Sequence, residues 1–193
     1  MTIKAIIFDC FGVLVVPGRY SLQYDFPDLA NELHDLTIRS DYGYISRQEF
    51  NQSAAELTGL SVDQFQTRYW EANVRNEDAF NWAKELKKTG KYKIGMLSNI
   101  GIGWLNDFIP ETEREQLFDS VVLSGEAGVT KPSVEIFDLI AQHLGVKPYE
   151  CVMIDDLLVN IDGAQRAGMK TILFGTTQQA QIDFAYHLES QDA

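Results

Sequence analysis

The sequence predicts an α/β fold in which a parallel sheet carries helices on both faces. From residue 77 onward, short apolar runs alternate with segments whose apolar residues recur at helical spacing. Together with an N-terminal apolar run, these amount to about five strands, a common size for an open sheet. Because strands separated by helices usually pair in parallel, we expect the sheet to be doubly wound.

Five apolar runs rich in β-branched and aromatic residues are the expected strands: Lys4–Phe8, Tyr92–Leu97, Ser120–Leu123, Cys151–Ile154 and Thr171–Phe174. Apolar residues at helical spacing over 79–86 predict a helix before the second strand. Pro132 and Gly145 bracket the next helix, because proline favours the first turn of a helix and glycine its end. A third helix is expected to end near Gly168, ahead of the last strand.

A helical insertion interrupts this alternation after the first strand. Ser46 with Glu49 forms one capping box and Ser61 with Gln64 forms a second, and no strand pattern accompanies them. An insertion at this point lies over the C-terminal edge of the sheet, where it can exclude water and select substrate. The expected units are a core of residues 1–14 and 77–193 and a small helical cap of residues 15–76.

The composition argues against several classes of function. The formal net charge of -12 opposes binding to nucleic acid and to anionic membrane surfaces. No run of about 20 apolar residues predicts a transmembrane helix, and no basic, cleavable leader precedes the first strand. We therefore expect a cytoplasmic protein whose partner is a small molecule. A small anion can still bind where a metal ion and a lysine reverse the local charge.

Acidic residues follow two of the expected strands. Asp9 ends the first strand at the edge where parallel sheets place their chemistry, so it is a candidate nucleophile; capping of a turn is the alternative. Asp155 and Asp156 end the fourth strand, and Asn160 follows one helical turn later. Because adjacent carboxylates repel each other unless a cation neutralises them, this pair indicates Mg²⁺ with oxygen ligands, with helix capping as the alternative.

Polar and basic groups occupy two further segments. Ser98 and Asn99 end the second strand with a hydroxyl and an amide, which can bind an oxyanion or can simply form a turn. Lys131 precedes Pro132 at the start of a helix, where its charge opposes the helix dipole and favours an anionic partner. On its own, Lys131 is also compatible with an ordinary surface position.

Taken together and in this order, the four segments resemble the motifs of the haloacid dehalogenase superfamily of hydrolases. The resemblance covers nearly the whole chain, and it implies a Rossmann-like core with a helical cap after the first motif. The short cap, the Leu97–Asn99 turn and the fourth motif are similar to those of sugar-1-phosphate phosphatases. Asp9 matches the first motif, Ser98 the second, Lys131 the third, and Asp155, Asp156 and Asn160 the fourth.

The resemblance also implies a role for each of these residues. Asp9 would attack phosphorus and form an aspartyl phosphate that water then hydrolyses. Mg²⁺ would bind Asp9, the backbone carbonyl of Phe11 and Asp156, and would reduce the repulsion between the carboxylate and the phosphate. The remaining implied roles are phosphate binding by Ser98, Asn99 and Lys131, and support of the ligands from a second layer by Asp155 and Asn160.

Phe11 departs from the family pattern, because the phosphatases usually carry a second aspartate at that position to protonate the leaving group. Loss of a general acid costs about 10² to 10⁴ in rate. Three functions stay open. The first is a Mg²⁺-dependent phosphatase whose small phosphorylated substrate, such as a sugar phosphate, has a good leaving group. The second is a 2-haloacid dehalogenase, which carries an aromatic residue there but a Ser-Ser-Asn fourth motif, and the third is a phosphate-binding member without turnover.

Overall fold

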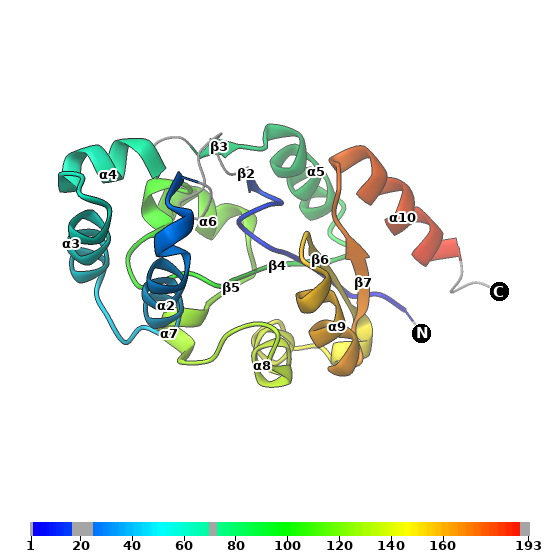
Figure 1. Cartoon of the computed structure of the whole chain (residues 1–193). Helices are drawn as coiled ribbons and strands as arrows, with labels where there is room; N and C mark the ends of the chain where they lie inside the picture. Colours follow the sequence, from blue (N-terminus) through cyan, green and yellow to red (C-terminus); the bar gives the residue numbers. More distant parts are fainter. Residues whose placement is uncertain (1, 17–24, 70–72, 190–193) are drawn as a thin grey trace.

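The computed structural model describes residues 2–16, 25–69 and 73–189, and a five-stranded parallel sheet forms its centre (Figure 1). The strand order is β5-β4-β1-β6-β7, so the chain builds outward from β1 on one side and then on the other. This arrangement confirms the predicted doubly wound α/β fold. The strands are β1 Ala5–Phe8, β4 Lys93–Ser98, β5 Ser120–Leu123, β6 Cys151–Asp155 and β7 Lys170–Leu173.

Helices cover both faces of the sheet, as Figure 1 shows. Because side chains alternate along a strand, Phe8 of β1 points to one face and Ile7 to the other, and the two belong to separate hydrophobic cores. The Phe8 ring packs edge-on against Trp82 with the ring centroids 5.4 Å apart. The first face is covered by α5 Glu77–Lys88 and α10 Thr177–Glu189, and the second by α8 Val134–His143 and α9 Leu158–Arg166.

Among the described residues between β2 and β3, the insertion contains three α-helices. Both predicted capping boxes are present: Ser46 N donates to Glu49 Oε2 at 2.8 Å, and Ser61 N donates to the Gln64 side-chain oxygen at 2.9 Å. Each box satisfies backbone N–H groups that the first turn of a helix leaves without an internal partner. The helices are α2 Ala30–Asp41, α3 Arg47–Thr58 and α4 Val62–Tyr69.

The prediction that no strand lies within residues 15–76 was wrong. Two short strands, β2 Val15–Val16 and β3 Val74–Arg75, pair antiparallel at the point where the chain leaves and re-enters the core. Each has two residues, which is too short for a period-2 pattern to be visible. Asn76 reinforces this ribbon, because its backbone N–H donates to Leu14 O at 2.9 Å. Residues 17–24 and 70–72 of the insertion lie outside the described residues.

Short helical segments complete the described chain. None of the described helices has both the length and the hydrophobicity that crossing a bilayer requires. The remaining segments are α6 Glu111–Leu117, α7 Ser124–Ala127 and three 3₁₀ turns, η1 Pro27–Leu29, η2 Leu105–Asp107 and η3 Pro148–Glu150.

Asp119 stabilises the start of two parallel strands, and we predict that its charge contributes to stability. Its carboxylate accepts from Ile94 N at 2.8 Å and pairs with Lys87 Nζ at 2.8 Å. Burial alone would raise the pKa of Asp119, but Lys87 and the Ile94 N–H outweigh it and lower that pKa. Asp119→Asn should lower the free energy of unfolding by about 1 kcal/mol at pH 7, because the pair is partly screened by solvent.

A depressed carboxylate pKa stabilises the folded state above the unfolded pKa, and this contribution disappears as the pH falls through the folded pKa. Urea titrations should therefore show the Asp119→Asn deficit at pH 7 and a much smaller deficit in acid. Glu115→Gln, at an exposed position on α6, is the matched control. A deficit that does not change with pH would show that the charge of Asp119 is not the stabilising feature.

Candidate active site

The fold brings the candidate residues to one edge of the sheet. Asp9 directly follows β1, Ser98 is the last residue of β4, and Asp155 is the last residue of β6. β1 lies between β4 and β6, so the three side chains meet at the C-terminal ends of neighbouring strands. The chain also reverses its direction of winding beside β1, and this is the position where open α/β sheets bind ligands.

Lys131 joins two carboxylates at this edge. Its Nζ lies 2.8 Å from Asp9 Oδ2 and 2.6 Å from Asp155 Oδ2, and all three side chains are buried. A buried carboxylate is costly unless it is paired and hydrogen-bonded, so the ammonium compensates both acids at once. The sequence left open whether Lys131 was an ordinary surface residue, and the structure shows that it is not.

Asn99 holds the backbone of Lys131. Its side-chain Nδ2 donates to Lys131 O at 2.9 Å, and its Oδ1 accepts from Lys131 N at 2.8 Å. Arg166 of α9 supports the next residue by donating to Pro132 O at 3.0 Å. The Asn99 amide, which the sequence suggested for phosphate, therefore uses one of its N–H groups and its oxygen to position the lysine.

Asp155 is surrounded by donors. Besides Lys131, the Leu157 N–H donates to Asp155 Oδ1 at 2.9 Å, and Asn160 Nδ2 lies 3.0 Å from Oδ1 and 3.1 Å from Oδ2. Asp155 is fully buried and Asn160 is 4% exposed. A carboxylate with this many donors is held in one orientation, which fits a supporting position behind the groups that meet substrate.

The electrostatics of the cluster follow from burial and from this pairing. Burial raises the pKa of Asp9 to about 8, although Lys131 acts in the opposite direction. Burial also opposes the charge of Lys131, but the two carboxylates outweigh it and raise the lysine pKa. Asp155 shows the reverse balance, because Lys131 and the neighbouring donors outweigh burial and lower its pKa. The ammonium and the Asp155 carboxylate are thus both charged at neutral pH.

Three carboxyl groups could hold a metal ion. Oxygen atoms of Asp9, Asp155 and Asp156 all lie within 4.8 Å of one another. Burial, followed by the charge of Asp155, raises the pKa of Asp156. Three carboxylates against the single ammonium of Lys131 leave two negative charges uncompensated when all are ionised. An all-oxygen set with this charge fits a hard divalent cation.

Gly12 allows the loop after β1 to approach this cluster. Its φ is +88°, and a Cβ at this position would overlap the carboxyl group of Asp156. Glycine is therefore required both by the left-handed conformation and by the lack of space. The loop that contains Phe11 therefore passes directly against Asp156 at Gly12.

Ser98 presents a buried polar group toward the same edge. Its side chain is fully buried, and its Oγ has no hydrogen-bond partner within the described part of the chain. A buried hydroxyl usually finds a partner, because the free energy lost on desolvation is otherwise not recovered. An oxygen atom of a bound ligand would satisfy it.

Phe11 stands where phosphatases of the resembled family carry an acid. Its ring packs edge-on against Phe108, with the centroids 5.1 Å apart. Arg75 Nη1 in turn donates to Phe108 O at 3.0 Å, which ties this aromatic pair to β3. Phe11 thus has a packing role and supplies no proton donor from its side chain.

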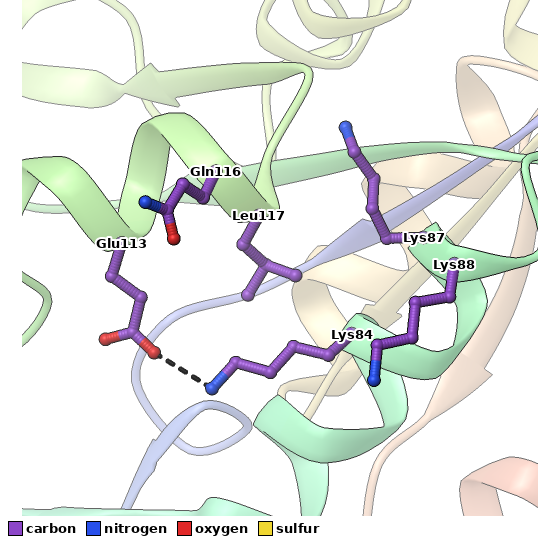
Figure 2. Close-up of a pocket in the computed structure, with 6 residues that line it drawn as sticks. All are labelled: Lys84, Lys87, Lys88, Glu113, Gln116 and Leu117. Carbon is purple, nitrogen blue, oxygen red and sulfur yellow. Dashed lines mark ion pairs between the residues drawn. The ribbon is translucent and has the colours of Figure 1, made fainter.

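A surface hollow beside α5 does not involve these residues. Figure 2 shows that it lies between α5 and α6, with Lys84 reaching Glu113 at 3.1 Å. None of the residues that line it belongs to the Asp9 cluster.

Asp41, at the end of α2, is a residue near this edge that the sequence did not indicate. The charge of Lys131 acts on its carboxyl group, so the two lie within electrostatic range. No local motif marks Asp41, because its position depends on how the insertion packs on the core. The Gly43 turn just after it was the available signal, and glycine at a helix end is too common to be specific.

A family model for haloacid dehalogenase-like hydrolases matches residues 3–168. The chain belongs to this family. The match includes every residue of the cluster at the sheet edge and the whole helical insertion.

Two named proteins from Bacillus are similar to this chain in sequence. The pyrophosphatase PpaX of Bacillus cereus strain AH820 is 26% identical over 189 residues, which cover 89% of this chain and 82% of that protein. The putative phosphatase YhcW of Bacillus subtilis strain 168 is 29% identical over 140 residues, covering 70% of this chain and 62% of that protein.

Solved structures share the fold. A HAD family enzyme from Bacteroides thetaiotaomicron, BT-2542, in complex with magnesium and inorganic phosphate, is 25% identical with a TM-score of 0.73, covering 88% of this chain and 93% of that one. A predicted HAD-like hydrolase from Porphyromonas gingivalis is 26% identical with a TM-score of 0.71, covering 89% and 91%. A dehalogenase at 21% identity has a TM-score of 0.63, covering 88% and 83%, and shows the fold alone.

Lys131→Met should destabilise the protein by about 3 kcal/mol at neutral pH, because it leaves the buried, charged Asp155 carboxylate, and Asp9 beside it, without the ammonium group that pairs with both. Replacing one of those carboxylates as well, in Lys131→Met with Asp155→Asn, should recover part of the loss. Chemical denaturation of both variants measures this coupling. Lys91→Met changes an exposed lysine and should have a small effect. If the losses in the free energy of unfolding simply add in the double variant, Lys131 and Asp155 are not coupled, which would contradict their pairing.

Proposed function

We propose that the protein is a Mg²⁺-dependent phosphatase that hydrolyses a small phosphorylated metabolite through an aspartyl-phosphate intermediate. The observation that best supports this function is the cluster in which Lys131 pairs with both Asp9 and Asp155. Asp156 lies close enough to these two aspartates for the three carboxyl groups to hold one metal ion. The names of the Bacillus relatives and the magnesium and phosphate in the BT-2542 complex support the same conclusion.

Asp9, the backbone carbonyl of Phe11 and Asp156 would hold the metal ion. Bound there, Mg²⁺ supplies positive charge that lets an anionic phosphate approach a carboxylate. Gly12 supports this set, because it brings the loop that contains Phe11 against Asp156. Asp155 and Asn160 would act from behind, since the donors around Asp155 already engage both its oxygens.

Asp9 is the proposed nucleophile. One of its carboxylate oxygens forms a bond to phosphorus as the bond to the leaving oxygen breaks, and the leaving oxygen takes the electron pair. Water then attacks phosphorus, releases inorganic phosphate and regenerates the carboxylate. The Cys10 N–H donates to Asp9 Oδ1 at 2.6 Å and Lys131 lies at Oδ2, so the side chain is held in place for attack.

Ser98 and Lys131 would bind the non-bridging oxygens of the phosphate. The Ser98 hydroxyl is buried and lacks a partner among the described residues, so a phosphate oxygen would complete its hydrogen bonding. Lys131 has three N–H donors, and the two carboxylates leave one of them for substrate. Asn99 contributes by fixing the lysine backbone, and its own backbone N–H lies in the turn where an oxyanion would bind.

The helical insertion is the proposed cap, with residues 15–76 forming the cap and residues 1–14 and 77–193 forming the core. The β2–β3 ribbon where the chain crosses between the two would be the junction. Because Phe11 supplies no acid, substrates with good leaving groups, such as anomeric sugar phosphates or acyl phosphates, fit the site best. The acidic net charge supports a small substrate over nucleic acid. The cytoplasm is the proposed location.

A 2-haloacid dehalogenase remains the second candidate, and Phe11 is the observation that favours it. Asp155 and Asp156 disfavour it, because they add negative charge beside a substrate that is itself a carboxylate. Phosphate release and halide release from the respective substrates separate these two functions. A phosphate-binding protein without turnover would bind Mg²⁺ and release neither product.

Asp9→Asn should reduce turnover at least 100-fold while leaving the fold intact, because an amide cannot form an acyl phosphate. Phosphate release from p-nitrophenyl phosphate with Mg²⁺ measures the loss, and circular dichroism confirms the fold. Asp78→Asn, an exposed aspartate in the first turn of α5, is the control. Activity that persists in several independent Asp9→Asn preparations would remove Asp9 from this role.

Asp156→Ala should raise the Mg²⁺ concentration needed for half-maximal activity by about tenfold or more. Titration calorimetry with Mg²⁺ alone should show the same weakening, independent of turnover. Asp162→Ala, which removes an exposed carboxylate from α9, is the matched control. If both variants bind Mg²⁺ as the wild type does, the metal is held elsewhere.

A further inference from the structure

The end of α2 is fixed over the edge of the sheet that carries the active site. Ser124, the residue after β5, donates from its Oγ to the backbone carbonyl of Asp41 at 2.6 Å. The same oxygen accepts from Ile100 N at 2.9 Å, two residues beyond Ser98. One hydroxyl thus connects the insertion to the ends of both β4 and β5.

Close backbone packing reinforces this connection. Gly43 has a φ of +74°, and a Cβ at this residue would overlap the carbonyl oxygen of Gly125 in α7. The backbone of the turn after α2 therefore packs directly against the backbone of α7, without side chains between them. Asp41 is the last residue of α2 and lies two residues before Gly43, so its backbone position relative to the core is set by two independent contacts.

Asp41 is partly buried at this junction. Burial raises its pKa to about 7, and Lys131 acts in the opposite direction. The charged groups on the surrounding elements are Lys131 before α8, the exposed Glu126 on α7, and Arg39 and Asp35, both exposed, on α2 itself. The loop of residues 100–103 after β4 contributes no charged side chain.

The proposed function leaves one chemical task without a residue. Departure of an alkoxide requires a proton, and the aromatic side chain of Phe11 cannot donate one. The leaving group lies on the side of the phosphate opposite Asp9, because displacement at phosphorus is roughly in line. The end of α2 is tied to this edge of the sheet through Ser124, whose Oγ donates to Asp41 O and accepts from Ile100 N.

We propose that Asp41 is the general acid of this enzyme and protonates the leaving oxygen from the helical insertion, in the absence of an aspartate at position 11. This inference rests on the proposed phosphatase function. The carboxylic acid gives its proton to the bridging oxygen as the bond from that oxygen to phosphorus breaks. The resulting Asp41 carboxylate then accepts a proton from the water that attacks the aspartyl phosphate, which restores the acid.

The test compares a substrate that needs protonation with one that does not. Phosphate release from ethyl phosphate and from p-nitrophenyl phosphate is measured for the wild type, for Asp41→Asn and for Asp35→Asn, the control at an exposed position of the same helix. Asp41→Asn should lose about 10² to 10⁴ in kcat/KM with ethyl phosphate. Its loss with p-nitrophenyl phosphate should be at least tenfold smaller.

Two further readouts separate proton transfer from a structural role. The wild-type rate with ethyl phosphate should fall as the pH rises through the pKa of Asp41, because the acid form is required. This alkaline limb of the pH–rate profile should be missing in Asp41→Asn. Phe11→Asp should restore activity with ethyl phosphate to Asp41→Asn by supplying an acid at the other position. Asp41→Glu, which keeps the acid, should retain the limb even if the asparagine variant folds poorly.

The outcomes distinguish this inference from the proposed function. A wild type that releases phosphate from both esters, with Asp41→Asn reduced equally on both, would overturn the role of Asp41 and leave the phosphatase function standing. A wild type that releases phosphate from neither ester, although it binds Mg²⁺, would overturn both.

Discussion

The pairing of one buried lysine with two buried aspartates is the interaction on which the candidate active site depends. Lys131 supplies the positive charge that Asp9 and Asp155 need in order to be buried together. Without it, the C-terminal ends of β1 and β6 would bring like charges together in a region from which water is excluded. The arrangement still leaves two negative charges when Asp156 is ionised, which makes the edge of the sheet receptive to a divalent cation.

Much of the surrounding structure serves to keep that lysine in position. Asn99 fixes its backbone from the end of β4, Arg166 supports Pro132 from α9, and Asn160 holds Asp155 in the orientation that meets the ammonium. These groups come from segments that are far apart in the sequence. A doubly wound sheet unites them because it places the ends of β1, β4 and β6 side by side.

The sequence predicted the fold and the members of this cluster because both leave local patterns. Strands buried on both faces appear as continuous apolar runs, and Ser120–Leu123 was located with its observed bounds. The motif order placed Asp9, Ser98, Lys131 and Asp155 on one edge. What the sequence could not predict depends on packing between distant segments: the two-residue strands β2 and β3, the use of the Asn99 amide to hold Lys131, and the position of Asp41 over the core.

The central claim, that phosphate is transferred to the protein before it reaches water, is tested most directly by stereochemistry at phosphorus. An isotopically chiral thiophosphate ester would be hydrolysed with Mg²⁺ in water enriched in a heavy oxygen isotope, and the configuration of the product determined. Two successive in-line displacements, the first by Asp9 and the second by water, predict net retention. Net inversion would show that water attacks the substrate directly and would contradict a covalent intermediate on Asp9.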